Sequence, residues 1–452
     1  MLRLGQLLVC LSLIAVALGS VADAQTPPTA TGSLKLRPIP KPVRISLLPK
    51  DKDKADPEKP TTPVWEPVGP AHTLGQCLAI GQERQPAIRA AVASLAASER
   101  GYLALMGLRN IADFFSPDLP IRRMQSQRGI SAAVAEVNKA RQENTYDISR
   151  LYFNYVYATQ QEQTANEIVE TMEAYLQAAV DIMKNERLDP KIKINDFTIG
   201  DLDNIIGEVK QLQETALLGR KTALDALKEA MGVDQSYAIS IGMKELPTMT
   251  GELTKASAIS MSLANRPEMV QADVIVDVTK YEVCAQSILK YRSTAQTFSN
   301  GADLHARLLP APMRTETEYR PGAVPPEMPS QLAGRVQDRV ARAEDYVIRQ
   351  QAVRDKVIAL IQLEASNAFL KYESTIVRVK ESRERHDRAQ ILVEKARNAV
   401  ITKLDPELLI KNVSLASKAQ ARYVEAVHTQ LQALVTLEKV TGGSFSPRYP
   451  GR

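Results

Sequence analysis

The chain has 452 residues, of which 44% are hydrophobic and 24% charged, and its formal net charge is +5. A charge this small over this length, with 5% aromatic residues and no basic-aromatic module, argues against a nucleic-acid partner. No internal stretch reaches the 18 or more uninterrupted apolar residues of a spanning helix, so the composition also argues against a bundle of transmembrane helices.

The N-terminus has the pattern of a secretory signal peptide. Arg3 provides a short basic start, the apolar stretch runs from about Leu7 to Leu18, and the small-residue triplet Ala22-Asp23-Ala24 ends the segment. A membrane anchor is the alternative, but the apolar stretch is too short to span a bilayer. We therefore expect residues 1–24 to be removed during export, and the Pro- and Lys-rich residues 25–70 to form an extended linker.

Two very long helices are predicted after the linker. No Pro or Gly interrupts the chain from Ser131 to Arg187 or from Val336 to Leu404. As single helices these stretches are about 85 Å and about 100 Å long. Apolar residues such as Ile168, Met172, Tyr175, Ala179 and Ile182 recur every three or four positions. Helices of this length fit rods, solenoids or tunnels rather than one compact globular domain.

The order of elements occurs twice along the chain. Each half has a short helix, a proline junction, an Ala-rich helix, an irregular insert, a very long helix, a tight tip and a return helix. The predicted segments are a first repeat 71–233 with a β-type insert at about 111–130, an inter-repeat linker 234–251, a second repeat 252–443 with a β-type insert at about 294–332, and a C-terminal tail 444–452.

Equivalent residues mark the start and the end of each repeat. Pro86 and Pro267 interrupt apolar helical patterns, and a proline at such a place opens a new helix. Gly232 and the pair Gly442-Gly443 follow the last helix of each repeat and are expected to be C-caps. The sequence therefore predicts a repeat junction at each proline.

These residues resemble the TolC-like outer-membrane efflux proteins over about residues 73–443. The openings "TLGQCLAIGQERQPAIRAA" and "ASAISMSLANRPEMVQAD" are similar to the family's amphipathic helix that ends in Asn-Pro or Arg-Pro. The segment "TIGDLDNIIGEVKQLQETALLGRKTALDALKEAMG" looks like the family's return helix, and the second return segment ends in the Leu-Glu-x-x-Thr-Gly pattern typical of these proteins.

The resemblance implies a mainly α fold of duplicated long antiparallel helical hairpins, which form a trimeric α-barrel tunnel with short or degenerate β-hairpin inserts. It implies a homotrimer in the cell outer membrane with a large periplasmic part, which conducts passively as the exit duct of a tripartite efflux or type I secretion system. A periplasmic adaptor protein, joined to an inner-membrane pump, would dock at the helix-hairpin tips. The tip residues are Leu188, Asp189, Pro190, Thr198, Asp201, Lys403, Leu404, Asp405, Pro406 and Glu407.

The two inserts leave a second function open. Segment 111–130 is short for two membrane strands, and segment 294–332 is rich in Pro, Arg and Glu. The alternative is a periplasmic, non-conducting helical scaffold related to TolC that has lost the membrane barrel. A secreted, monomeric helical binding protein is a third reading, against which the long helices argue.

No pattern in the sequence indicates an enzyme, a cofactor or a metal site. The four histidines are scattered without ligand spacing, and we expect His386 on a solvated helix face. The tetrapeptide Gly219–Thr222 resembles the end of a phosphate loop but falls in mid-helix. Asp196, Asp201 and Asp203 lack the Gly and Glu of a calcium loop.

The two cysteines beyond the signal segment are predicted to stay unpaired. Cys77 lies nine residues before its repeat's proline, and Cys284 lies seventeen after its own. In parallel repeats this offset is about 39 Å along a helix, whereas a disulfide needs Cα atoms within about 7 Å. We expect two free, buried thiols.

Overall fold

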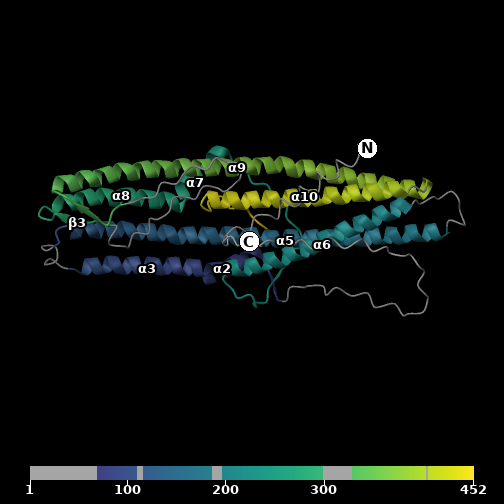
Figure 1. Ribbon diagram of the computed structural model, residues 1–452, viewed down its shortest axis with the longest axis horizontal. Coiled ribbons are helices and arrows are strands. Elements are labelled where there is room, and N and C mark those ends of the chain that lie inside the picture. Colours follow the sequence, from purple (N-terminus) through teal and green to yellow (C-terminus); the bar gives the residue numbers. More distant parts are fainter. Residues whose placement is uncertain (1–68, 109–115, 186–195, 299–327, 404–405) are drawn as a thin grey trace, which may run out of the picture. The chain divides into compact units, whose positions relative to one another are not determined.

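The computed structural model describes residues 69–108, 116–185, 196–298, 328–403 and 406–452 (Figure 1). The helices of the first repeat are α2 (Leu74–Arg84), α3 (Pro86–Gly107), α5 (Leu119–Asn185) and α6 (Asp196–Ala230), and those of the second are α7 (Lys255–Asn265), α8 (Pro267–Ile288), α9 (Val336–Lys403) and α10 (Pro406–Val440). The strands are β1 (Ala71–His72), β2 (Ser240–Ile241), β3 (Thr294–Gln296) and β4 (Gln331–Ala333). Residues 1–68, with the expected signal peptide and most of the linker, lie outside the described residues.

Each repeat contains one long antiparallel hairpin, α5 with α6 and α9 with α10. Lys210 pairs with Glu173 and Arg220 with Glu162, so residue numbers rise on one helix of the first hairpin as they fall on the other. The long helices have 67 and 68 residues, or about 100 Å each. The predicted fold of duplicated long helical hairpins is confirmed.

The helices pack as a row rather than around a central core. In one half of the helical body α6 packs on α5, α5 on α10 and α10 on α9. In the other half α3 packs on α5, α5 on α8 and α8 on α9. The outer helices of the row are therefore α9 on one side and α3 with α6 on the other.

The apolar stripe of α5 faces its own return helix. Met172 is fully buried against Leu202 and Ile206 of α6, and Ile168 and Tyr175 pack on the same cluster. The predicted three-and-four spacing of these α5 residues is therefore the face that closes the first hairpin.

The first insert is shorter than the sequence predicts. The expectation of a β-type segment at about 111–130 is wrong for residues 119–130, which belong to α5. Leu119 and Ile121 are buried, and Asp118 pairs with Arg122 one turn later at 3.1 Å. Local burial and this i,i+4 ion pair favour helix over strand, and residues 109–115 lie outside the described part.

A short sheet closes the base of the second insert. β3 pairs with β4 in antiparallel register, with Ala295 opposite Leu332. The Thr297 amide adds a hydrogen bond to the Ser330 carbonyl at 2.9 Å. The two ends of the insert are thus held together, while residues 299–327 lie outside the described part.

The inter-repeat linker and the C-terminal tail both contact the start of the first repeat. β1 pairs in parallel with β2 of the linker. The Gly75 amide donates to the Gly451 carbonyl at 2.8 Å, and Arg452 pairs with Glu438 of α10. The buried Tyr449 packs on Phe153 of α5, with ring centroids 5.3 Å apart. The tail thereby connects α10 to α2 and α5.

A glycine ends the return helix of each repeat, as the sequence predicts. Gly232 and Gly442 both have φ +66°, and their amides donate back to the last turns of α6 and α10. A Cβ on Gly232 would lie 2.7 Å from the Cα of Gln85, and one on Gly442 would lie 2.7 Å from the Asn265 carbonyl oxygen. In both repeats the glycine therefore contacts the backbone immediately before the proline junction.

Gly232→Ala and Gly442→Ala are expected to destabilise the fold strongly. Each adds a methyl group that meets backbone atoms and places alanine in the left-handed region, so we expect a loss of about 3 kcal/mol or more. Gly443→Ala is the matched control, because Gly443 has φ +77° but no neighbour within 4 Å. It carries the conformational cost alone, about 1 kcal/mol. Chemical denaturation measures all three; equal losses would mean that the close contacts do not matter.

Candidate functional site

The predicted tip residues fall in the least described part of the chain. Leu188, Asp189, Pro190, Leu404 and Asp405 lie outside the described residues. The others belong to helices whose side chains are not described at these positions: Thr198 and Asp201 in α6, Lys403 at the end of α9, and Pro406 and Glu407 at the start of α10.

Each junction proline is the first residue of its helix. α3 begins at Pro86 and α8 at Pro267, where a missing backbone donor costs nothing. The residues before them, Gln85 and Arg266, have non-helical backbone and make no side-chain cap. The side chains of these two residues are therefore available for other partners.

The first junction is held by side-chain amides. The Gln85 side chain donates to the Ala230 carbonyl at 3.0 Å, and the buried Asn144 of α5 donates to the same oxygen at 2.7 Å. These bonds satisfy a carbonyl at the end of α6 that has no partner within the helix. One α5 residue thus connects the return helix to the junction at Pro86.

The second junction is held by charges. The buried guanidinium of Arg266 donates to both oxygens of Glu268, at 3.0 and 3.2 Å, and also to Glu364 of α9. The two carboxylates outweigh the effect of burial and raise the pKa of Arg266 above its ordinary value. Arg266 also lowers the pKa of Glu268, so the pair stays ionised. This ion pair joins the α7–α8 junction to α9.

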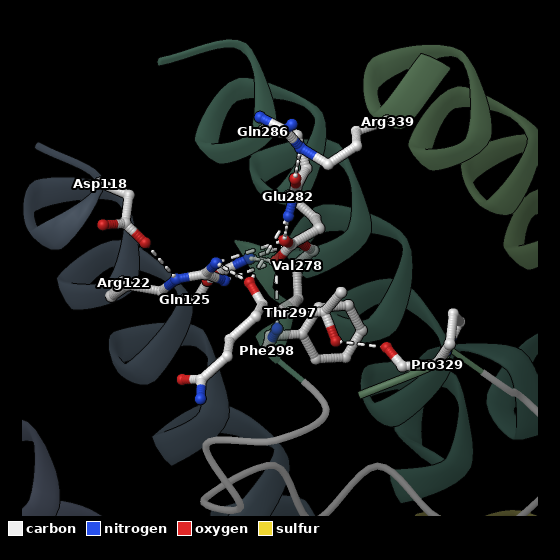
Figure 2. A network of polar contacts seen from close by, with 11 residues as sticks. Asp118, Arg122, Gln125, Val278, Glu282, Gln286, Thr297, Phe298, Pro329 and Arg339 are labelled. Carbon is white, nitrogen blue, oxygen red and sulfur yellow. Dashed lines mark hydrogen bonds and ion pairs between the residues drawn. The ribbon is translucent and has the colours of Figure 1, made fainter. Parts of the chain in front are cut away.

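A cluster of connected polar side chains (Figure 2) lies where α3 and α8 end and α5 and α9 begin, here called the insert end. Glu282 of α8 is fully buried and accepts from Arg122 of α5 at 2.5 Å. It also accepts from Gln125 at 3.1 Å, Gln286 at 2.7 Å and the Phe298 amide at 3.1 Å. One carboxylate thereby links α5, α8 and the chain that leaves β3.

Arg339 continues this cluster to α9. Its guanidinium is fully buried and donates to the Gln286 side chain at 3.0 Å, the Leu289 carbonyl at 2.5 Å and the Gly334 carbonyl at 2.8 Å. The Leu289 carbonyl oxygen at the end of α8 is thus paired with a side chain of α9. We call Asp118, Arg122, Gln125, Glu282, Gln286 and Arg339 the insert-end network.

The charges of the insert-end network are matched. Burial alone would lower the pKa of Arg122, but Glu282 and Asp118 outweigh it and raise that pKa above the ordinary value. Arg122 also donates to the Gln296 carbonyl at 2.7 Å, next to the base of the second insert. An arrangement of this kind positions backbone.

Sequence reasoning missed this network, although a signal was present. Glu282 and Gln286 are four residues apart within a largely apolar stretch, so they share one helix face. A buried acidic residue needs a basic partner, but Arg122 is 160 residues away and stands next to another arginine. Only the fold identifies which arginine pairs.

The histidines do not gather, but two of them are more buried than the sequence suggests. The expectation of a solvated face is wrong for His386, which is only 16% exposed because its ring stacks on Tyr423 of α10. His428 stacks on Tyr157 of α5 with centroids 4.3 Å apart and donates to the Asn154 side-chain oxygen at 2.8 Å. Burial lowers the pKa of His428 to about 4. His305 lies outside the described residues.

Both cysteines are free, as predicted, but they differ in exposure. Cys77 is fully buried, and burial raises the pKa of its thiol to about 12. The expectation of a buried thiol is wrong for Cys284, which is exposed on α8. The row of helices leaves one side of α8 uncovered, so a cysteine in an apolar helical pattern can face solvent instead of a neighbouring helix.

The described residues contain no gathered set of potential metal ligands. Within them, no three or more His, Cys, Asp or Glu side chains are grouped to hold an ion. Gly219–Thr222 lie in the interior of α6, away from any helix N-terminus. None of the described helices combines the length and apolar character needed to cross a bilayer.

The fold matches those of solved outer-membrane channels. The outer-membrane channel OprN aligns with a TM-score of 0.64 and 13% identity, over 82% of this chain and 90% of that one. The open state of the Neisseria gonorrhoeae MtrE outer-membrane channel gives 0.62 and 15%, over 82% and 89%. The Campylobacter jejuni CmeC outer-membrane channel gives 0.60 and 12%, over 86% and 92%.

Comparison of the amino-acid sequence gives less information than comparison of the fold. No protein-family model and no curated protein matches this chain. The chain therefore has the fold of these outer-membrane channels, and the predicted resemblance to TolC-like proteins is confirmed at that level.

Glu282→Gln is expected to lower the free energy of unfolding by about 2–4 kcal/mol, because it leaves Arg122 and three further donors around an uncharged group. Glu381→Gln is the matched control, since Glu381 pairs with Arg385 on an exposed face at 3.3 Å. Its loss should be below about 0.5 kcal/mol. Urea denaturation measures both, and similar losses would contradict a structural role for the network.

The stability of the wild-type chain should fall between about pH 6.5 and pH 4 because of His428. Its pKa is depressed in the folded state, so over this range the unfolded chain takes up a proton that the folded chain does not. The expected loss is up to about 3 kcal/mol, complete near pH 4. His428→Gln should flatten this part of the profile, whereas His386→Gln should keep it. An unchanged profile in His428→Gln would show that other groups cause the acid sensitivity.

Proposed function

We propose that this chain is the outer-membrane exit duct of a tripartite efflux or type I secretion system, and that it conducts passively as a homotrimer. The observation that carries the proposal is the shared fold with solved outer-membrane channels over more than four fifths of the chain. The sequence pattern of a signal peptide at residues 1–24 supports export to that location.

The row of helices supports association with further copies. α9 and α6 form outer edges, and both carry large exposed apolar side chains, such as Ile348 and Leu218, each 65% exposed. Long helices that expose such side chains to water are expected to associate with neighbours. Edge-to-edge contact between identical chains closes a row into a ring, which buries both edges.

The tips are the proposed docking point for a periplasmic adaptor and, through it, an inner-membrane pump. In the sequence the Leu-Asp-Pro tripeptide occurs once in each repeat, as Leu188-Asp189-Pro190 and as Leu404-Asp405-Pro406. A proline at such a place stops one helix, and an aspartate before it can cap the next. Twofold repetition in each chain would offer six similar tips in a trimer.

A periplasmic scaffold with the same helical fold, which does not conduct, is the second candidate. The composition of residues 299–327 favours it, because Pro and charged residues recur through this insert. The two candidates agree on the trimer and differ on conduction.

Leu218→Asp on the edge helix α6 is expected to weaken the trimer at least tenfold and to abolish conductance, because it buries an unpaired charge between copies. Leu415→Asp is the matched control, since Leu415 is 52% exposed on α10, an inner helix of the row. Light scattering of the detergent-extracted protein gives the mass, and planar bilayers give the conductance.

The wild type and Leu415→Asp should be trimers that conduct. A trimer that leaves membranes on an alkaline wash and never conducts would replace the duct with the scaffold. A wild-type monomer at micromolar concentration would refute both.

A further inference from the structure

Large apolar side chains are exposed around the insert end. They come from the end of α3, the start of α5, the last turn of α8 and the turn that follows it. Tyr291 in that turn is fully exposed. We call this set, together with the exposed basic residues between them, the insert-end patch: Leu103, Met106, Leu108, Met124, Ile288, Lys290, Tyr291, Arg292 and Arg335.

The patch belongs to one end because polar contacts hold the three helix ends together. Arg123 of α5 donates to the Leu105 carbonyl at 2.9 Å and also to that of Leu108, which joins α5 to α3. Arg122 and Glu282 join α5 to α8, and Arg339 joins α9 to the end of α8 (Figure 2). The patch thus surrounds a rigid helix end.

The charge that this end presents to solvent is positive. Lys290, Arg292 and Arg335 are exposed. Asp118 pairs with Arg122, and the exposed Asp338, which accepts from the Arg335 amide at 3.1 Å, leaves these three cations in excess. Exposed apolar side chains that alternate with Lys and Arg match an anionic lipid surface, where the rings and methyl groups enter the interface and the cations meet phosphates.

We propose that the insert-end patch rests on the headgroup region of an anionic lipid bilayer, with Ile288 and Tyr291 inserted. The proposal rests on the membrane location in the proposed function and names the lipid contact. A second copy of the chain is the other possible occupant, but side-by-side helices bury stripes that run along their length. This patch instead goes around one end, across α3, α5 and α8, which fits a plane perpendicular to the helices.

A single tryptophan can report on this contact, since the chain has only one, Trp65. The full chain with Trp65→Phe and Tyr291→Trp would be mixed with vesicles of phosphatidylethanolamine and phosphatidylglycerol that carry brominated acyl chains. We expect a blue shift and quenching of emission at position 291. Leu218→Trp in the same background is the control, and we expect no quenching there.

The charge requirement is tested separately by sedimentation with vesicles. Lys290→Glu with Arg292→Glu should lower binding at least about tenfold, because each cation near an anionic surface contributes to attachment. Lys371→Glu with Lys380→Glu, two exposed lysines in the interior of α9, is the matched control and should bind like the wild type. Circular dichroism checks that both fold.

The proposal would be overturned if the emission at position 291 were blue-shifted in the trimer even without vesicles, but not in Leu218→Asp. That result would assign the patch to contact between copies. Equal binding by both charge variants would also overturn it. If the protein conducts but the tryptophan at position 291 is not quenched, the lipid contact is refuted and the proposed function is not. Loss of the trimer and of conductance in the wild type refutes the proposed function, while the tryptophan measurement stays valid.

Discussion

The glycine at the end of each return helix is the constraint on which the rest of the fold depends. Gly232 and Gly442 turn the chain with φ +66° and lie against backbone atoms just before Pro86 and Pro267. Each proline starts a helix that leads away from the glycine contact. The return helix of the same repeat ends at that contact. The repeated junction is therefore the point where one hairpin is locked to the short helices of its own repeat.

The two repeats satisfy the same geometry with different chemistry. At the first junction neutral amides of Gln85 and Asn144 pair with the Ala230 carbonyl, whereas at the second Arg266 pairs with two carboxylates. The insert-end network adds a further buried ion pair on α8, which is enclosed by α5 and α9. Buried ion pairs contribute little net stability, but breaking one is costly, so they select a single register for helices that would otherwise slide.

The apolar edges of the row of helices link the fold to the proposed function. Within one chain the row leaves the exposed side chains of α6 and α9 uncovered, and in the proposed homotrimer neighbouring copies would cover them. In that proposed trimer, closing the row with further copies would form a tunnel from these same helices. The insert end stays rigid because Arg122, Glu282 and Arg339 are paired inside it, and a rigid end is what a surface contact requires.

The sequence by itself determined the helices, the twofold repeat and the helix-ending residues, because spacing, proline and glycine act within a few residues of themselves. Local pairing also explains why residues 119–130 are helical although the sequence predicts a β-type insert there. The ion pair of Asp118 with Arg122 favours helix at the start of α5. Only the tertiary structure decided that Glu282 meets Arg122, that His386 is covered by Tyr423 and that Cys284 stays exposed. These outcomes depend on which helices become neighbours in the row, and residues far apart in the chain carry no local signal of that choice.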